Sequence, residues 1–396
     1  MTEGTQKRFH EIDALRVTAL FLLIVYHVFV AYQPFAPEVW FVQYRESLAD
    51  YWFLGEWLNI WRIPILFVIS GISLGFIARR RSIKEILIDR IMRLEPPLFF
   101  GCLCLCPLLF LFYLISVGES LIYLPHPAHL WYVLFLVSYV FLSLPLIAYL
   151  KRHPNNRAAG WLKRHCPWVL WPLFAVLLAL ESVLFEPEFF SAFYNRYWYG
   201  FVCFLAGYGF IYLGEIFWNS VRSLAPLAAV IGGFLYLVRM EVIAIPYLGG
   251  HPGITALESA TWMIAFLGYG SRYLNQPNAV FSKMNAAIFP IYILHLPAQQ
   301  AIALVLFQWN RSAELTFFVH LALTLGCSIL LYGIVRKIGG WLNPLMGINP
   351  EKSSEPPIPS RWAQVGSLVT IWVLTPITLA AGIFFMLVGS QLLANS

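Results

Sequence analysis

The stretch HEIDALRVTALFLLIVYH, residues 10–27, runs from a polar start directly into an apolar segment predicted over residues 14–34. Asp13 and Arg16 are three residues apart and share a helix face. Arg16 and His27 are eleven residues apart. Around the helix axis, their side chains therefore point in directions that differ by only about 20°, and about 16 Å separates them along the axis. Because ionisable groups within a membrane span are costly, this stripe predicts a functional site with an anion-binding guanidinium and a deeper titratable base.

The composition of the chain excludes a soluble fold. Of its 396 residues, 60% are hydrophobic, 17% aromatic and 12% charged, whereas soluble domains are usually about 45–50% apolar and about 25% charged. The apolar runs are continuous rather than alternating, which excludes a membrane barrel. At about 20 residues for each span, they predict an all-α, polytopic transmembrane helix bundle of about eleven spans. The predicted limits are 14–34, 55–78, 96–117, 129–150, 167–185, 198–216, 222–239, 253–271, 286–307, 315–335 and 366–390.

The positions of Lys and Arg predict the orientation of these spans. With a cytoplasmic N-terminus, twenty of the 26 basic residues fall on the cytoplasmic side, and Arg16 and Arg62 lie within spans. The other side receives Arg45, Arg196, Arg239 and Arg311. This asymmetry predicts an N-in, C-out topology. The net charge of +6 therefore reflects orientation, and no nucleic-acid partner is predicted.

The sequence divides into three predicted parts. Residues 1–335 form the functional bundle of ten spans, and residues 366–396 form an accessory transmembrane helix with a short outer tail. Residues 336–365 contain NPEKSSEPPIPS, whose Pro- and Ser-rich composition is typical of a linker, here on the cytoplasmic side. No internal repeat is visible in the sequence, which argues weakly against transporter folds built from repeated halves.

A basic stretch, RRRSIKEILIDRIMRLEPP at residues 79–97, is predicted as a cytoplasmic loop between the second and third spans. Arg90 and Arg93 have helical spacing within it, and two guanidiniums so placed suit bidentate capture of phosphates. An alternative stays open, since any cytoplasmic loop gathers Arg and Lys for orientation and for anionic lipids.

Further polar side chains lie within or beside the spans. They are His295 in IFPIYILHLP, His129 and Trp131 in PHPAHLWYVLF, Ser70 in LFVISG, and Glu258 at the start of the eighth span. Purely structural roles remain open for three of these residues. Ser70 would allow close helix packing, Trp131 would belong to an aromatic belt, and Glu258 would favour the helix dipole. For the first stripe, Arg16 snorkelling and a His27 bond to a backbone carbonyl stay possible. The six Cys form no CxxC pair, and no metal site is predicted.

Five motifs in this order resemble the acyltransferase 3 family of integral-membrane acyltransferases. They are IDALRVTALFLLIVYH, LFVISGISL, LIDRIMRLEPP, HLWYVLFL and FPIYILHLP, and they are distributed over the region of the first ten spans. Within the family, ALESATWMIAFLGYG and the final His motif most resemble the glucan biosynthesis protein C branch, whose members are thought to succinylate periplasmic glucans.

The resemblance implies transfer of a succinyl or acetyl group from cytoplasmic acyl-CoA to a carbohydrate hydroxyl on the outer side. It matches His27 to the catalytic His, Arg16 to the first-helix Arg, and Arg90 and Arg93 to the pair that meets the donor's phosphates. We expect His27 to act as a general base, with Asp13 orienting Arg16 through a salt bridge. A covalent acyl-His or acyl-Ser70 intermediate is the less economical alternative. His129, Trp131, Glu258 and His295 are expected around the acceptor.

The family resemblance also predicts the inner membrane of a bacterium as the location, with membrane lipids and the glycan acceptor as partners. Two other functions stay open. A transporter or flippase for an anionic or lipid-linked saccharide would also use a buried Arg and His, although it needs no cytoplasmic grip on coenzyme A. A non-catalytic membrane scaffold would need none of these residues.

Overall fold

The computed structural model describes residues 9–153, 157–166, 169–185, 193–241, 252–340 and 342–348. Within these ranges the chain is helical and has no strand. Its α-helices are α1 (His10–Val30), α2 (Trp52–Ala78), α3 (Ile83–Phe100), α4 (Cys106–Val117), α5 (Trp131–Arg152), α6 (Arg157–His165), α7 (Leu170–Phe185), α8 (Phe193–Leu213), α9 (Glu215–Glu241), α10 (Pro252–Tyr273), α11 (Ala279–Leu306), α12 (Ala313–Ile338) and α13 (Leu342–Leu345). Short helical turns are η1 (Ala36–Val39), η2 (Ala49–Tyr51), η3 (Gly101–Leu105) and η4 (Ala128–Leu130).

The all-helical, polytopic prediction is confirmed. Each of the first ten predicted spans overlaps at least one helix, and the third runs across α3, η3 and α4. Seven helical stretches in the described ranges are long and apolar enough to cross a membrane. Helices α7 and α8 contain shorter apolar segments. The chain is therefore a multi-pass membrane protein. The eleventh predicted span, 366–390, and most of the predicted linker lie outside the described residues.

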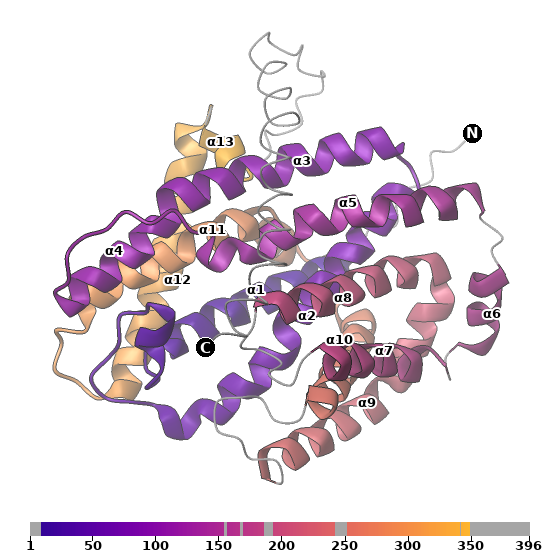
Figure 1. Ribbon diagram of the computed structural model, residues 1–396, viewed down its shortest axis with the longest axis horizontal. Coiled ribbons are helices and arrows are strands. Elements are labelled where there is room, and N and C mark those ends of the chain that lie inside the picture. Colours follow the sequence, from indigo (N-terminus) through magenta and orange to yellow (C-terminus); the bar gives the residue numbers. More distant parts are fainter. Residues whose placement is uncertain are drawn as a thin grey trace.

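The helices pack around a centre formed by α1, α2 and α8. Figure 1 shows α3 and α5 side by side along one edge and α7, α9 and α10 at the opposite edge, with α11 and α12 next to α1. Helix α2 packs extensively against α8, and α10 packs against both α9 and α7. One large cluster of buried apolar side chains runs through these contacts and includes Phe67, Tyr139 and Phe204.

Small residues bring α2 and α8 into backbone contact. A side chain at Gly71 would collide with the backbone of Phe204, and one at Gly207 would collide with the backbone of Val68. The two glycines thus interlock the helices from opposite sides. Within a bilayer, where water does not drive helices together, such close approach is a main source of helix association.

The basic stretch between the second and third spans differs from the sequence prediction, because most of it is helical rather than a loop. Ser82 caps α3 by accepting a hydrogen bond from the Glu85 amide, and the Glu85 side chain accepts one from the Ser82 amide. This capping box starts the helix at Ile83, about three and a half turns before the predicted span at residue 96. Helix α3 then continues through Pro96 and Pro97.

Prolines within the helices free carbonyl groups that side chains from other segments then bond. A proline lacks the N–H that would bond the carbonyl four residues earlier. Pro64 thus frees the Ile60 carbonyl, which accepts from Ser259 Oγ at 2.7 Å. Pro107 likewise frees the Leu103 carbonyl, which accepts a hydrogen bond from the Tyr123 hydroxyl. These bonds satisfy backbone groups that would otherwise be costly in a bilayer.

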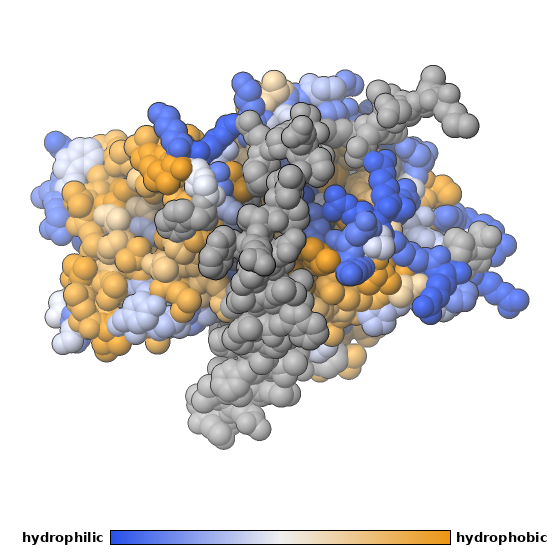
Figure 2. Space-filling view, turned by 90° about the horizontal axis from the view of Figure 1, so that it is seen from above, coloured by the Kyte–Doolittle hydropathy of each residue, from blue (hydrophilic) through white to orange (hydrophobic). Residues whose placement is uncertain are grey.

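The outer surface of the bundle is apolar. Figure 2 shows hydrophobic residues over much of one face, with hydrophilic residues gathered toward its margins. Large apolar side chains that are more than 60% exposed lie on several of the helices. They include Leu184 on α7, Val230 and Phe234 on α9, Val305 on α11, and Phe318 and Leu330 on α12. Such exposure suits contact with lipid tails and would be unfavourable in water.

Candidate active site

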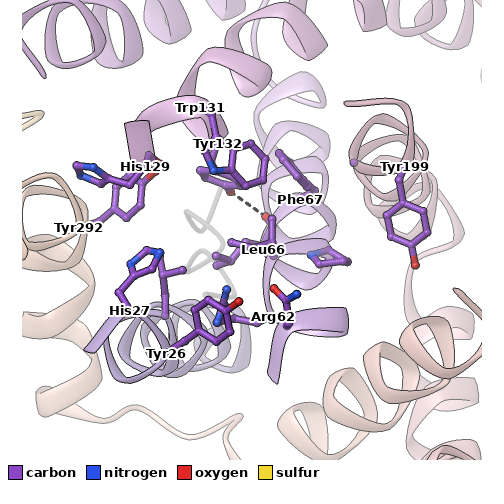
Figure 3. Close-up of a pocket in the computed structure, with 15 residues that line it drawn as sticks. Tyr26, His27, Arg62, Leu66, Phe67, His129, Trp131, Tyr132, Tyr199 and Tyr292 are labelled. Atoms are coloured by element: carbon purple, nitrogen blue, oxygen red, sulfur yellow. Dashed lines mark hydrogen bonds between the residues drawn. The ribbon is translucent and has the colours of Figure 1, made fainter. Parts of the chain in front are cut away.

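A cavity of about 120 Å³ lies where α1, α2, α5, α8 and α11 meet. Three of the predicted site residues, His27, His129 and Trp131, line it, and Figure 3 shows these side chains around the cavity. The other lining residues are Leu23, Tyr26, Asn59, Arg62, Ile63, Pro64, Leu66, Phe67, Tyr132, Tyr199, Gly200 and Tyr292. The structure thus brings together groups from four of the motifs that the sequence singled out.

His27 and His295 form a direct pair across α1 and α11. Nδ1 of His27 lies 2.9 Å from Nε2 of His295, and the two rings are stacked at 12° between their planes. On its other side, Nδ1 of His295 lies 2.6 Å from the carbonyl oxygen of Tyr292. A carbonyl only accepts hydrogen bonds, so we assign the proton of His295 to Nδ1. Neutral His295 then accepts from His27 Nδ1, which leaves Nε2 of His27 unprotonated.

His129 is fixed by a carbonyl that a proline frees. Pro297 removes the helical donor for the Ile293 carbonyl, and Nε2 of His129 donates to that oxygen at 3.1 Å. The Tyr292 hydroxyl donates in turn to the His129 carbonyl. The His129 ring also meets the His295 ring edge-on, with centroids 5.4 Å apart. Pro297 of α11 therefore provides the acceptor that positions His129 in η4.

Ser70 forms part of a separate hydrogen-bonded chain beside the cavity. Its hydroxyl lies 2.9 Å from the hydroxyl of Tyr132, which donates to the Leu66 carbonyl at 3.1 Å. This second bond is drawn in Figure 3. The arrangement makes Ser70 a donor to Tyr132 and ties α2 to α5. The described contacts of Ser70 do not include a base.

Arg62 is a cavity residue to which the sequence argument gave no role beyond its place within a span. Its side chain is only 2% exposed, and its guanidinium carbon lies 3.8 Å from the centre of the Tyr26 ring. Figure 3 shows the two side chains beside His27. A permanently charged side chain near the middle of an apolar segment was the available signal.

Arg16 and Asp13 lie outside the cavity, in a polar cluster near the start of α1. Arg16 pairs with Asp13 at 3.4 Å and donates to Ser73 Oγ at 2.7 Å and to Asn285 Oδ1 at 3.0 Å. The Asn285 amide donates to Asp13 at 2.9 Å. These bonds join α1, α2 and α11. Along α1, about 16 Å separates this cluster from His27.

Arg90 and Arg93 have different surroundings on α3. Arg93 is 49% exposed at its side chain and pairs with Asp89 at 3.1 Å, and Asp89 also pairs with Arg81 at 2.9 Å. Arg90 is partly buried, and its Nε has no hydrogen-bond partner among the described residues. Of the two, Arg90 is therefore the guanidinium that pairs with no carboxylate among the described residues.

Glu258 lies away from the histidines, in a buried ion pair. Arg239 Nε lies 2.6 Å from one of its oxygens, and Trp262 Nε1 donates to the other at 3.3 Å. Arg239 also pairs with Glu56 at 3.4 Å. The structure thus assigns Glu258 contacts that join α2, α9 and α10, rather than a contact with an intramembrane histidine.

A short polar segment precedes η4 at the predicted outer mouth of the bundle. His126 Nδ1 accepts from the Ala128 amide at 2.8 Å, and its ring lies 5.4 Å from that of Trp40. Partial burial lowers the pKa of His126, so this imidazole is neutral at pH 7. Trp40 is 37% exposed, whereas Tyr44 and Trp52 are buried. Of these three outer aromatic residues, only Trp40 presents a ring to an external ligand.

A family model described as an acyltransferase domain (acyltransferase 3) matches residues 9–333, which is most of the chain. The chain belongs to the acyltransferase 3 family. The resemblance inferred from the five motifs is therefore confirmed, and the chain is an acyltransferase. No curated protein and no solved structure gives a significant match. In this family member, the matched region contains the His27 cavity, the Arg16 cluster and Arg90.

Proposed function

We propose that this membrane acyltransferase moves a succinyl or acetyl group from cytoplasmic acyl-CoA to a carbohydrate hydroxyl on the extracytoplasmic side. The acceptor would be a periplasmic glucan or another envelope glycan, and the location the inner membrane of a bacterium. The observation that carries the proposal is the His27–His295 pair, which leaves Nε2 of a cavity-lining imidazole free to accept a proton.

The reaction requires one proton acceptor and one position for the thioester. His27 Nε2 removes the proton of the acceptor hydroxyl as that oxygen attacks the thioester carbonyl. The carbon–sulfur bond breaks, the ester forms, and coenzyme A leaves as a thiolate that takes up the proton from His27. His295 holds the His27 ring during both transfers, because its Nε2 accepts a hydrogen bond from the Nδ1–H of His27.

Direct transfer is favoured over an acyl-serine intermediate. A serine nucleophile needs an adjacent base, whereas Ser70 contacts the Tyr132 hydroxyl at 2.9 Å. Ser70 therefore fits a structural role, in which it holds Tyr132 beside the cavity. The proposed reaction does not need a covalent acyl-enzyme.

The donor's phosphates would meet Arg90 and Arg93, near the predicted cytoplasmic side. Arg90 is partly buried and has an Nε without a partner among the described residues, and Arg93 is exposed and shares Asp89 with Arg81. Arg16 and Asp13 lie between this end and His27, and the pantetheine arm would pass them. A guanidinium that faces phosphate in a low-dielectric setting forms strong, directional hydrogen bonds.

Coenzyme A release from proteoliposomes tests the proposal. Purified protein is reconstituted with acetyl-CoA or succinyl-CoA on one side and a linear glucan on the other. Wild type should release coenzyme A only when glucan is present and should acylate the glucan, and His27→Ala should do neither. Glucan movement without thioester turnover would instead favour the transporter, and equal turnover by His27→Ala would exclude His27 as the base.

A further inference from the structure

Two segments from different predicted outer connections meet next to the histidine pair, one following α1 and one preceding α5. They meet at the Trp40 ring, whose centre lies 5.4 Å from that of His126. Trp40 is 37% exposed. The next residue, Phe41, is buried, and its ring centre lies 6.1 Å from that of His27. Two consecutive residues therefore connect the base of the proposed reaction with the surface of the molecule.

Backbone strain is concentrated in the same two segments. Among the residues that the structure describes, two that are not glycine have a positive φ, Trp40 at 61° and Ala128 at 40°. This conformation is unfavourable for residues with a side chain, and most of all for bulky ones. Ala128 lies between His126 and the cavity-lining His129. Because such strain clusters at ligand-binding and active sites, its position here indicates a binding function.

Gln300 of α11 holds Trp40 in this conformation. Its Nε2 donates to the Trp40 carbonyl at 3.0 Å, and its Oε1 accepts from the Val42 amide at 3.0 Å. The ring of Phe110 on α4, 5.1 Å from the Trp40 ring, packs against the side chain. Gln300 lies five residues after His295, about 7.5 Å further along α11. Trp40 is thus fixed to the helix of His295, beyond the reacting pair toward the predicted outer side.

His126 places a hydrogen-bond donor beside the Trp40 ring. An amide N–H only donates, so the bond from Ala128 to Nδ1 at 2.8 Å leaves the proton of the neutral imidazole on Nε2. An exposed indole next to an N–H donor matches a sugar ring, which has apolar C–H groups on its faces and hydroxyls around its rim. Neutral His126 and Trp40 carry no charge, which suits an uncharged sugar better than the phosphates of the donor.

We propose that Trp40 and His126 form a second acceptor subsite, which binds a sugar unit next to the one whose hydroxyl is acylated. The inference rests on the proposed function and adds to it a binding site outside the cavity. A single sugar at His27 does not extend to Trp40, whereas an oligosaccharide occupies both positions. The enzyme should therefore prefer an oligosaccharide to a single sugar.

The test compares methyl glucoside, a single sugar unit, with a linear glucan oligosaccharide as acceptors. For each, kcat/KM with a fixed acyl-CoA is measured in reconstituted wild type, Trp40→Asn, Trp40→Phe and Trp309→Asn. Asn tolerates the left-handed conformation, so Trp40→Asn removes the ring without adding backbone strain. Trp309 is the matched control, because it is 39% exposed and lies in the predicted outer connection between α11 and α12.

We expect wild type and Trp309→Asn to prefer the oligosaccharide. Trp40→Asn should lower the ratio of oligosaccharide to methyl glucoside kcat/KM about tenfold, as expected for loss of an aromatic contact. Trp40→Phe should keep part of the preference, because it keeps a ring. No preference in wild type, an equal loss for both acceptors in Trp40→Asn, or the same effect in Trp309→Asn would overturn the inference. Each of these results would leave the His27 reaction standing.

A binding measurement covers the case in which Trp40→Asn impairs the reaction by disturbing the fold near His27. In His27→Ala, which retains the subsite, the oligosaccharide alone should raise the midpoint of thermal unfolding. The shift should be smaller when Trp40→Asn is added to His27→Ala. Equal shifts in the two proteins would contradict the role of Trp40. If wild type turned over neither acceptor, the proposed function would fail together with the inference.

Discussion

At the scale of single residues, His295 determines which nitrogen of His27 carries the proton. The His295 Nδ1 proton is committed to the Tyr292 carbonyl, so its Nε2 can only accept from His27. This makes His295 a positioning residue for the base. Without it, the His27 ring is free to turn and to exchange its two tautomers.

Replacing His295 with Phe should therefore lower kcat about 10²-fold or more, within the range that general base catalysis contributes. The KM for acyl-CoA should change little, because His295 does not line the cavity. His295→Gln, whose amide oxygen accepts a hydrogen bond, should retain more activity than His295→Phe. Steady-state kinetics of the two purified variants checks this. Equal activities in the Phe and Gln variants would contradict the positioning role.

The two arginines of α3 should differ in their effect on donor binding. Arg90 has an Nε with no partner among the described residues, whereas Arg93 shares Asp89 with Arg81. Arg90→Gln should therefore raise the KM for acyl-CoA about tenfold or more, and Arg93→Gln should raise it less. The measurement is the KM of each variant for acyl-CoA at several salt concentrations. A larger effect for Arg93→Gln would reverse the assignment.

Contacts between side chains of one helix could be predicted from the sequence, whereas contacts between different helices could not. Helical spacing correctly placed Asp13 beside Arg16, because both lie on one helix. The His27–His295 bond joins positions 268 residues apart, and no periodicity within a helix can reveal such a contact. The pairing of Glu258 with Arg239 could not be predicted for the same reason, since the two residues lie on different helices. Arg62 was visible as a charge within a span, but its neighbours were not.

At the scale of helices, the contact between α2 and α8 depends on two glycines that face opposite backbones. Gly71→Ala or Gly207→Ala would push a methyl group into the backbone of Phe204 or Val68, which cannot rotate away. Each change should destabilise the protein by about 1–3 kcal/mol or more. Gly209→Ala on the same helix is the control, because a side chain there meets nothing within 4 Å.

Thermal unfolding in detergent measures this difference. The midpoint should fall for Gly71→Ala and Gly207→Ala and should stay near that of wild type, or rise slightly, for Gly209→Ala. A common shift in all three variants would show that glycine content, rather than backbone contact, sets the effect.

Helix limits were predicted well where apolar runs decide them and poorly where capping does. The span predicted from residue 96 begins inside α3, which already starts at Ile83 because the Ser82–Glu85 capping box begins a helix in a polar stretch. Pro96 and Pro97, at the predicted start of the span, lie inside that helix. Hydropathy reports only the part of a helix that is apolar, so it misses such polar extensions.

At the scale of the whole molecule, the charge asymmetry predicts which ends of the helices share a side of the membrane. In a variant with its six cysteines replaced by serine, Glu119→Cys and Ser312→Cys should react with an impermeant maleimide in spheroplasts. Arg80→Cys and Gln276→Cys should react only after permeabilisation. All four positions are exposed. The opposite pattern would place the Arg90 end on the outer side and separate it from cytoplasmic acyl-CoA.

The topology matters because it determines on which side of the membrane each site of the proposed reaction lies. Arg90 and Arg93 lie in the middle of α3, whose start is predicted to face the cytoplasm. The Arg16 cluster lies near the start of α1, and His27 is close to the other end of α1. In the proposed reaction, a donor bound at Arg90 and Arg93 would extend toward His27, and the acceptor would approach from the opposite side of the membrane. In the proposed reaction, the donor and the acceptor would therefore reach the cavity from different sides.

The most direct test of His27 as the catalytic base is mass spectrometry of envelope glycans from three strains. One lacks the gene, one is complemented with wild type, and one with His27→Ala expressed at the same level in the membrane. We predict that wild type adds a fixed acyl mass to a glycan and that His27→Ala does not. The same added mass in the His27→Ala strain would contradict the account.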